Sequence, residues 1–396
     1  MWLAMNLVNK LWKDIMMNKR RSHGEGSVTP RGTSKWRIRY DAPVGVDGVR
    51  RQVSETVTGT KSKALSLLRE KISSLETGSF VSPTQQTVGQ YFQTWLIRHA
   101  ENVSPKTVEG YATMIRNYVV PHLGSVKLQT LESSQLSSLY ADMAERGLSS
   151  ATRAHCHRTI RKALGDAVKQ NTLANNPALG VTPPRQRRRE MAVWDVSEYK
   201  SFMDAASSDE FRDFFEFAAL TGMRRSEVTG LKWKTVDLDL ATLRVVETLQ
   251  RIGGRGLVVG VPKSRGSRRS IALSVRTVDL LRDVRRKQLE AHMAVGAVFG
   301  SAEYVFTDQL GQPYDSGRPS KHFSDIARSS GLPKQTLNSL RHFHVSVLMA
   351  SNTHIKVVSE RLGHSSVAFT MDVYGHLMPG MQEQAALAID SALLSG

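Results

Sequence analysis

Five side chains in the C-terminal half of the chain are suited to the chemistry of phosphate esters. In chain order they are Arg224, Lys263, Arg341, His364 and Tyr374. A phosphodiester that is attacked in line passes through a five-coordinate phosphorus with extra negative charge on its non-bridging oxygens. Guanidinium groups match these oxygens with paired N–H donors, and a phenol can serve as the attacking nucleophile. The set therefore contains the groups needed to break a phosphodiester by tyrosine attack without a metal ion.

Four short motifs hold these side chains. They are Thr221-Gly222-Met223-Arg224-Arg225-Ser226-Glu227, Pro262-Lys263-Ser264, Asn338-Ser339-Leu340-Arg341-His342, and Leu362-Gly363-His364 followed by Met371-Asp372-Val373-Tyr374. By itself, a tyrosine near the end of a chain is more often a half-buried helix residue than a nucleophile. The order, context and spacing of the motifs change that balance, because they resemble the tyrosine recombinases of the phage integrase family. The resemblance covers the C-terminal half motif by motif and the rest of the chain more loosely.

The resemblance implies a role for each side chain. Arg224 and Arg341 would hold the phosphate, and His364 would hydrogen-bond it. Lys263 would protonate the departing 5′ oxygen as a general acid. Tyr374 would attack phosphorus, leaving a 3′-phosphotyrosyl link and a free 5′-hydroxyl.

Alternatives stay open at two of these positions. Arg225 is the competing candidate for the first phosphate-binding arginine, although the Thr-Gly-x-Arg context favours Arg224. Glu227 lies one helical turn further on, where it can orient that arginine. Around Lys263, other arginines of the same turn leave the proton donor unfixed, and phosphate contact alone would also explain the lysine.

One position departs from the family pattern. The family commonly has His-x-x-Arg where this chain has Asn338 and Arg341. An amide can donate a hydrogen bond to a phosphate oxygen but cannot shuttle a proton. The proton of Tyr374 would then leave by another route, and His342, one helical turn from Asn338, is a candidate stand-in. We expect reduced but surviving activity.

Composition points to a multi-domain protein with a polyanionic partner. The chain has 396 residues, one cysteine and a net charge of +18, of which residues 1–192 carry +15. That length predicts two or three domains, and the charge predicts binding to DNA; a merely solvated surface is the plain alternative. Cys156 alone forms no intramolecular disulfide, which fits a reducing cytosol. No stretch is long and apolar enough to cross a bilayer, and the N-terminus lacks a secretion signal.

The N-terminal region predicts a basic extension over residues 1–21 and a small domain over 22–80. Basic and apolar residues alternate from Lys35 to Tyr40, which indicates a strand with one charged face. A second strand up to Val57 and a following helix complete the unit. The resemblance implies a three-stranded domain that binds arm-type DNA sites, whereas a solvated sheet without a partner is the alternative. The expected DNA-contacting residues are Lys35, Arg37 and Arg39.

Residues 82–180 predict a helical unit, and residues 181–192 a basic linker. The unit has about four amphipathic helices, one of them opened by Ser104 as N-cap and Pro105 as first helical residue. The resemblance implies the core-binding domain of the family, although spacing alone supports only a helical bundle. The linker, stiffened by two prolines, is expected to follow the phosphate backbone. Its arginines are Arg185, Arg187, Arg188 and Arg189.

From residue 193 to 396 helices alternate with one compact β region. Strands are expected near 242–248, 256–261 and 268–271, and helices near 274–288, 317–328, 338–351, 355–362 and 381–394. The expected fold class is mainly α with small β-sheets, in several domains, the last a mixed α/β catalytic domain of the tyrosine-recombinase type. The terminal helix, rich in Ala and Leu, suits docking on a neighbouring copy.

Together these features predict a site-specific DNA recombinase, the integrase of a phage or other mobile element, with excision as the reverse reaction. Because of Asn338, a catalytically weak or inactive integrase-like DNA-binding protein is the main alternative; a type IB topoisomerase is the third. We expect no cofactor and no metal, since the phosphotyrosyl link keeps the bond energy and no Walker A motif is present. The expected partners are double-stranded attachment-site DNA, further copies in a homotetramer, and accessory DNA-bending or directionality factors. The expected location is the cytoplasm, on the nucleoid.

Overall fold

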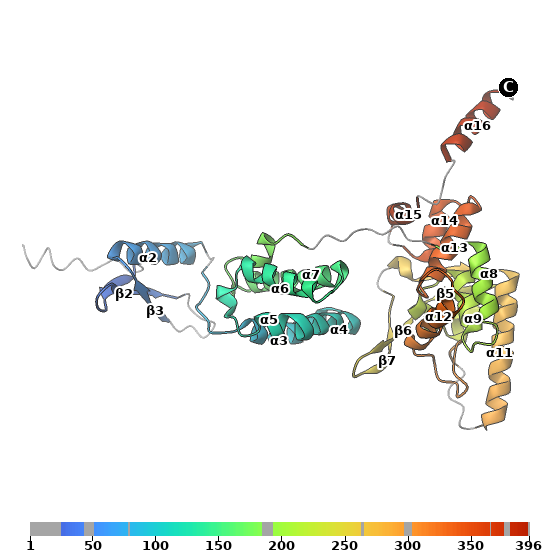
Figure 1. The fold of residues 1–396 in the computed structure, drawn as a ribbon, viewed down its shortest axis with the longest axis horizontal. Coiled ribbons are helices and arrows are strands. Elements are labelled where there is room, and N and C mark those ends of the chain that lie inside the picture. The colour runs from blue at the N-terminus through green and yellow to red at the C-terminus, as the bar shows by residue number, and fades with distance from the viewer. Residues whose placement is uncertain are drawn as a thin grey trace, which may run out of the picture. The chain divides into compact units, whose positions relative to one another are not determined.

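The computed structural model describes residues 25–42, 51–77, 80–183, 193–262, 265–296, 303–364, 366–375 and 381–394. The predicted extension 1–21, the four linker arginines and Lys263 lie outside these ranges. The chain forms two compact units, Met1–Arg188 and Arg189–Gly396 (Figure 1). The fold is mainly α-helical with small antiparallel sheets, which confirms the predicted fold class.

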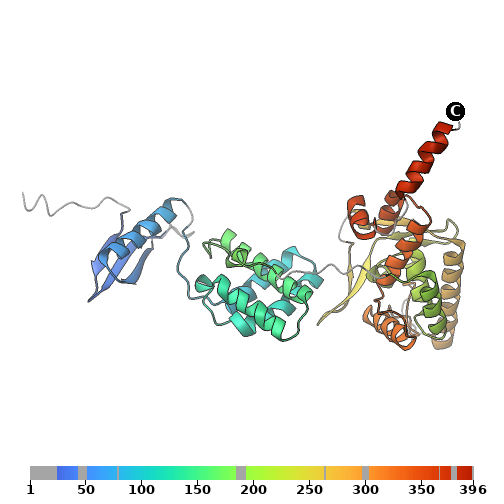
Figure 2. The same cartoon turned by 45° about the horizontal axis from the view of Figure 1, so that its top comes forward.

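The first unit begins with a three-stranded antiparallel sheet in the order β1-β2-β3. Its elements are β1 (Ser27–Pro30), β2 (Lys35–Asp41), β3 (Gln52–Thr58) and helix α2 (Lys61–Glu76). Successive side chains of a strand point to opposite faces. Ile38 and Tyr40 are therefore buried under α2, which crosses one face of the sheet (Figure 2), while Lys35 and Arg39 are exposed on the other face. The alternation predicted for this strand is confirmed.

The rest of the first unit is helical. Its helices are α3 (Val88–His99), α4 (Pro105–Met114), α5 (Val120–Leu123), α6 (Ser133–Glu145) and α7 (Ser150–Lys169). The predicted start of α4 is confirmed, because the Ser104 side chain accepts a hydrogen bond from the Thr107 backbone N–H. A π-helical turn joins α4 to α5, so this stretch ends only at Gly124. Phe92 and Trp95 lie in a core that all the longer helices share.

In the second unit, helices surround a small β region. The helices are α8 (Val196–Ala205), α9 (Arg212–Thr221), α10 (Arg225–Thr229), α11 (Val275–Val295), α12 (Gly317–Ser329), α13 (Ser339–Ala350), α14 (Ile355–Leu362), α15 (Val367–Tyr374) and α16 (Met381–Leu394). The strands are β4 (Val236–Asp237), β5 (Thr242–Val245), β6 (Thr248–Ile252), β7 (Gly256–Gly260) and β8 (Arg269–Ala272). The predicted bounds of α14 and α16 are confirmed, whereas α11 continues beyond the predicted end at residue 288.

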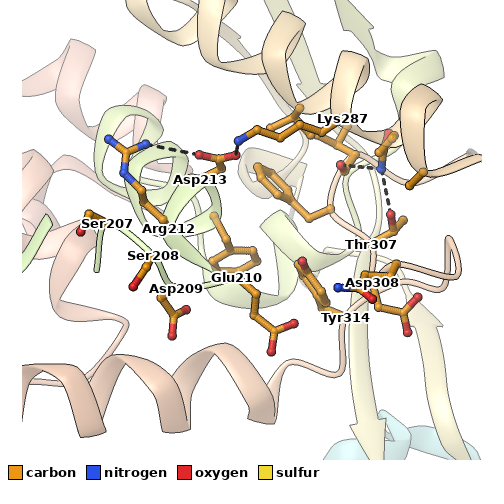
Figure 3. A pocket seen from close by; sticks show the side chains of 17 residues that line it. Ser207, Ser208, Asp209, Glu210, Arg212, Asp213, Lys287, Thr307, Asp308 and Tyr314 are labelled. Carbon is orange, nitrogen blue, oxygen red and sulfur yellow. Dashed lines mark hydrogen bonds and ion pairs between the residues drawn. The ribbon is translucent and has the colours of Figure 1, made fainter. Parts of the chain in front are cut away.

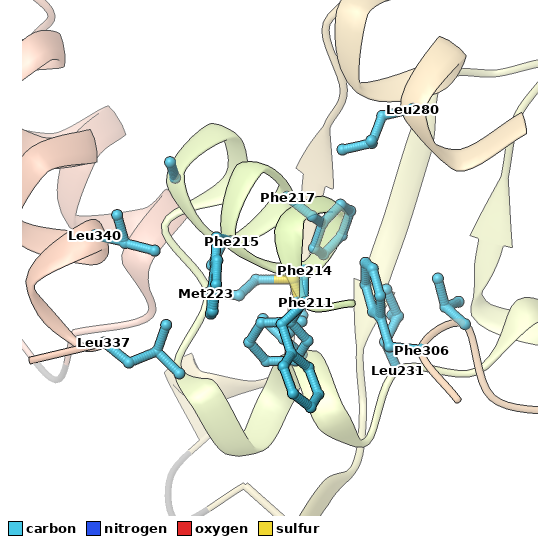
Figure 4. Packing of buried hydrophobic residues seen from close by; sticks show 14 of the residues in the cluster. Phe211, Phe214, Phe215, Phe217, Met223, Leu231, Leu280, Phe306, Leu337 and Leu340 are labelled. Carbon is cyan, nitrogen blue, oxygen red and sulfur yellow. The ribbon is translucent and has the colours of Figure 1, made fainter. Parts of the chain in front are cut away.

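Helix α9 is the centre of the second unit. Its phenylalanines Phe214, Phe215 and Phe217 are almost completely buried, and Figure 4 shows them among side chains from several other elements. Leu340 of α13 is part of the same core. This packing fixes the ends of α9 and α13, and both ends contribute to the site described below.

The predicted strand over residues 242–248 is wrong in one respect. The chain forms two strands there, with β5 in the sheet β4-β5-β8 and β6 paired only with β7. Between them, Glu247 forms an ion pair with Lys232 at 2.8 Å. The Thr229 hydroxyl donates to the Leu249 carbonyl, which ties β6 to α10 instead of to β5. Strand propensity alone does not reveal this change of partner.

Candidate active site

The loop after α9 is shaped by Gly222. This residue caps the helix with a φ of 64°, and a Cβ added there would lie 2.6 Å from the His344 ring. Such a left-handed cap is cheap only for glycine. The chain therefore turns sharply and presents Arg224 at the start of α10, as the Thr-Gly-x-Arg motif predicted.

Arg224 is one of two arginines bound to the same buried carboxylate. Its Nη1 donates to Oε1 of Glu227 at 2.9 Å, and its backbone N–H donates to Oε2 at 2.9 Å. Arg269 of β8 donates to both oxygens of Glu227, at 2.9 and 3.3 Å. Burial raises the pKa of Glu227, but these hydrogen bonds and charges outweigh it and lower the pKa overall. Glu227 is thus a fixed anion that orients two guanidinium groups.

Arg341 is held by the ends of two helices. Its guanidinium donates to the carbonyls of Gly222 and Leu362, both at 2.8 Å, and the residue is only 4% exposed. Helix C-termini carry partial negative charge, which favours a cation there. Burial, followed by the nearby charge of Arg224, lowers the pKa of Arg341 to about 9. The guanidinium is charged at neutral pH but has lost most of its contact with water. A bound phosphate would therefore stabilise its charged form.

The turn at Gly363 brings the arginines together. Gly363 has a φ of 67°, and a Cβ there would lie 2.9 Å from the Gly266 carbonyl oxygen. The carbonyl of Gly363 accepts a bond from Arg224 at 3.4 Å, next to the Leu362 carbonyl that binds Arg341. Both predicted arginines therefore converge on this turn.

His364 follows the turn and is oriented by a threonine. Its Nδ1 lies 2.7 Å from the hydroxyl of Thr370, which is fully buried in α15. Its ring stacks on that of Tyr374 with a centroid distance of 6.3 Å and an interplanar angle of 4°. Burial, then the charges of Arg341 and other arginines, lowers the pKa of His364 to about 4. It is a neutral imidazole at physiological pH.

Tyr374 ends α15 with its ring buried and its hydroxyl hydrogen-bonded. The residue is 2% exposed and packs in an apolar cluster that includes Met349 and Leu362. Its hydroxyl lies 2.6 Å from Nδ1 of His342. Burial raises the pKa of Tyr374, and the charges of Arg341 and Arg224 oppose that rise. The side chain is thus both a core residue and part of the cluster of polar groups.

Asn338 lies at the start of α13 and touches the same histidine. Its Nδ2 is 3.3 Å from Nε2 of His342, so this ring has one polar neighbour on each nitrogen. The positions 338, 341 and 342 share one face of α13, because residues three and four apart are neighbours on a helix. The structure therefore brings together seven of the predicted residues: Arg224, Glu227, Asn338, Arg341, His342, His364 and Tyr374.

The other predicted site residues lie on the first unit or outside the described residues. Lys35, Arg37 and Arg39 lie on β2 of the first unit. Lys263 and the arginines at 185, 187, 188 and 189 fall outside the described residues. The roles of these side chains stay predictions.

Sequence reasoning placed Arg269 only among the basic neighbours of Lys263 and missed its pairing with Glu227; it missed Thr370 altogether. A usable signal existed for the arginine: in the short strand β8 it alternates with the buried Ile271, so both side chains point inward. Its side chain is 5% exposed, against 38% for that of Arg224. For the threonine, the spacing of α15 gave no signal, since its partner His364 lies in a turn.

A separate pocket on the second unit has a different character. It has a volume of about 490 Å³ and is lined by residues such as Asp209, Glu210 and Asp308 (Figure 3). Lys287 at its edge is paired with Asp213 at 2.6 Å. None of the predicted site residues that the structure describes lines it, and its carboxylates disfavour a phosphate. The arginine cluster is the better match for a phosphate.

Two other kinds of site are absent from the described residues. No helix among them is long and apolar enough to cross a membrane. Nor do they contain a group of three or more His, Cys, Asp and Glu side chains that could hold a metal ion.

Known proteins match this chain along most of its length. Residues 193–380 match the phage integrase family, and residues 87–144 match the N-terminal SAM-like domain of phage integrases. A XerC-like tyrosine recombinase of Caldanaerobacter subterraneus subsp. tengcongensis is 26% identical over 354 residues, which cover 85% of this chain and 90% of that protein.

Two solved structures have the same fold. The Tn1549 transposon integrase, in complex with a circular intermediate DNA, has a TM-score of 0.63 and 22% identity, covering 73% of this chain and 95% of that one. A lambda integrase tetramer bound to a Holliday junction has a TM-score of 0.56 and 16% identity, covering 89% and 96%. The fold is thus that of these two DNA-bound integrases. The chain belongs to the phage integrase family.

Proposed function

We propose that this chain is a site-specific tyrosine recombinase, the integrase of a phage or another mobile element. It cuts and rejoins double-stranded DNA through a 3′-phosphotyrosyl intermediate. The observation that carries the proposal is the convergence of Arg224 and Arg341 on one turn, beside His364 and the hydroxyl of Tyr374. Sequence relatives named integrase or tyrosine recombinase support the same class.

The charge of the cluster suits a phosphate in its transition state. Among the described residues it contains three guanidinium groups, from Arg224, Arg269 and Arg341, and one carboxylate, from Glu227. The excess positive charge stabilises negative charge that develops on non-bridging oxygens, and it costs no reorganisation because the groups are already fixed. We assign His364 the Nε2–H tautomer, in which Nδ1 accepts from the Thr370 hydroxyl and Nε2 donates to a phosphate oxygen.

Attack requires the phenol oxygen to reach phosphorus. Tyr374 is 2% exposed, so binding of DNA has to uncover it. The proposal therefore includes a shift of α15 against α13 when the attachment site is bound. Lys263 is assigned the protonation of the departing 5′ oxygen.

Other partners follow from the fold and the charge. The lambda integrase tetramer on a Holliday junction supports a homotetramer on DNA for this chain as well. Arm-type DNA sites are assigned to the sheet face with Lys35, Arg37 and Arg39, and the linker arginines to the phosphate backbone. We place the protein in the cytoplasm on nucleoid DNA, with accessory bending or directionality factors.

The test is to trap the covalent intermediate. The substrate is a duplex carrying the direct repeat that flanks the element encoding this protein. A nick next to the cleavage site lets the short fragment that bears the new 5′-hydroxyl diffuse away. We expect a denaturant-resistant protein–DNA adduct with the wild type and none with Tyr374→Phe. The Tyr374→Phe variant should still bind the duplex in a gel-shift assay.

The same assay decides between the alternatives. A pure DNA-binding protein, which Asn338 would allow, shifts the duplex but gives no adduct with the wild type. A type IB topoisomerase relaxes supercoiled plasmids that lack any attachment site. Either outcome would overturn the proposed function.

A further inference from the structure

We propose that His342 accepts the proton of Tyr374 during cleavage and returns it during rejoining, with Asn338 as the positioning residue that fixes the tautomer of His342. This inference rests on the proposed recombinase function. It assigns a proton route to a chain whose His-x-x-Arg position carries an amide instead of an imidazole.

The geometry is that of a three-residue relay. The Tyr374 hydroxyl lies 2.6 Å from Nδ1 of His342, and Nε2 of the same ring lies 3.3 Å from the Asn338 side-chain amide. A general base must lie within about 2.6–3.2 Å of the atom that carries the proton it takes. His342 meets that condition in the DNA-free protein.

His364, the other histidine of the cluster, does not meet the condition. Its ring is parallel to that of Tyr374 at a centroid distance of 6.3 Å, and its Nδ1 is used by Thr370. A stacked ring does not direct a nitrogen at the phenol oxygen. His364 is therefore left to contact the phosphate, and His342 is the base.

The surroundings of His342 keep it neutral before DNA binds. The groups that face it are Arg341 on its own helix, Tyr374 on α15, and His364 on the turn before α15. Burial, then the charge of Arg341, lowers the pKa of His342 to about 4. A phosphate seated between the two arginines would offset that charge and raise the pKa, so the ring becomes a better base when substrate is present.

Asn338 selects which nitrogen is free. An amide side chain can present either its oxygen or its nitrogen, because rotation about its last bond exchanges them. The structure places the amide nitrogen toward Nε2; in the exchanged orientation the oxygen accepts the Nε2–H bond and leaves the lone pair of Nδ1 facing the phenol. The same orientation also suits the imidazolium that forms after proton transfer. This is how a third group orients the histidine of a nucleophile–histidine pair.

In both cleavage and rejoining, every proton that moves has a donor and an acceptor. The Tyr374 oxygen forms a bond to phosphorus while its proton moves to Nδ1 of His342. The bond from phosphorus to the 5′ oxygen breaks, and that oxygen takes a proton from the general acid assigned to Lys263. In rejoining, the 5′-hydroxyl attacks phosphorus and gives its proton back to the group assigned to Lys263. The tyrosine–phosphorus bond breaks, and Nδ1 of His342 returns its proton to the phenol.

The first test needs no DNA. Histidine ring nitrogens of the full-length protein are observed by 15N NMR at neutral pH, with His342→Asn used to assign the resonance. We expect His342 to be in the Nε2–H tautomer, with an Nδ1 shift that changes in Tyr374→Phe. An Nδ1–H tautomer, or an Nδ1 shift unaffected by Tyr374→Phe, would overturn the relay whatever the recombinase activity.

The second test measures cleavage of the nicked duplex under single-turnover conditions. His342→Ala should lower the rate by roughly 10²–10⁴-fold, the usual contribution of a general base, and Asn338→Ala by about tenfold. His292→Ala on α11, an exposed histidine of the same unit, is the matched control and should keep the wild-type rate.

A sulfur-substituted substrate separates base from acid. With sulfur in place of the departing 5′ oxygen, the leaving group needs no proton, so loss of a general acid is bypassed and loss of a base is not. We expect His342→Ala to stay slow on this substrate. Recovery of its rate would overturn the assignment of His342 as the base.

The pH profile tests the positioning role of Asn338. A carboxylate next to Nε2–H stabilises the imidazolium and raises its pKa, so in Asn338→Asp the acid limb of cleavage should move to higher pH by about one unit. An unmoved limb contradicts the role. If the wild type gives no adduct at all, the proposed function fails, while the NMR result still judges the relay independently.

Discussion

At the scale of single residues, the site depends on one buried carboxylate. Glu227 is 2% exposed and binds Arg224 and Arg269 at once, so it holds in place two of the cations that we propose meet the phosphate. Three guanidinium groups without this anion would repel one another at short range. In the proposed reaction, Glu227 would therefore act by holding these arginines, without touching the DNA.

The substitution Glu227→Gln tests this role. We expect the free energy of unfolding at pH 7 to fall by about 3 kcal/mol, because a buried ion pair loses its charged partner. Since the pKa of Glu227 is lowered in the folded state, its stabilisation is present above the unfolded pKa and lost as pH falls through the folded one. Thermal unfolding of wild type and variant should therefore converge in acid. A constant difference across pH would contradict the argument.

At the scale of elements, helix ends do the positioning. Gly222 ends α9 and Gly363 ends α14, both in the left-handed conformation, and the carbonyls at these ends bind Arg341 and Arg224. A helix end offers carbonyls that no intrahelical N–H uses. The two arginines thereby donate hydrogen bonds to free carbonyls at the helix ends, and these bonds bring both guanidinium groups to the turn at Gly363.

Gly363→Ala should disturb both fold and activity. The added Cβ lies 2.9 Å from the Gly266 carbonyl oxygen, on top of the strain of a φ of 67°. We expect unfolding to become easier by about 3 kcal/mol and adduct formation to fall more than DNA binding does.

Gly331 provides the matched control for that substitution. Its φ is 66°, and a Cβ there has no atom within 4 Å. Gly331→Ala should cost only the conformational strain, about 1 kcal/mol, with no loss of adduct. Equal effects of the two substitutions in thermal unfolding and trapping assays would show that contact at Gly363 is unimportant.

At the scale of the whole molecule, positive charge is spread unevenly along the chain, because residues 1–192 carry +15 of the net +18. In the sheet of the first unit, β2 places Lys35, Arg37 and Arg39 on one face, opposite the face covered by α2. Their cross-strand neighbours on that face are small hydroxyl residues, such as Thr56 beside Arg37 and Ser54 beside Arg39. A face of this kind can approach a phosphate backbone closely.

Replacing these three residues by glutamine should weaken binding to arm-type DNA. The dependence of log K on log salt should become shallower by about 0.9 for each phosphate that the variant no longer neutralises, while cleavage of the core duplex persists. The control removes the same charge from α2, by glutamine at Lys61, Lys63 and Arg69, which are exposed on the helix. An identical salt slope in both variants, measured by titration at several salt concentrations, would rule out the sheet face.

Much of the fold followed from local sequence. Ser104 and Pro105 marked the start of a helix, and the apolar period placed α14 and α16 at their observed bounds, because caps and periodicity act over a few residues. The split between β5 and β6 did not follow, since both segments have strand propensity and only their partners differ.

The sequence by itself determined which chemical groups the protein has and in what order, since motif spacing specifies helix faces and turns. Only the tertiary structure decided which of them meet. Glu227 and Arg269 are 42 residues apart, and His342 and Tyr374 are 32 apart. Such contacts depend on how α10, β8, α13 and α15 pack around a shared core, and local conformational preference does not encode that packing. The pairing of His342 with Tyr374 is therefore a property of the fold more than of the motif.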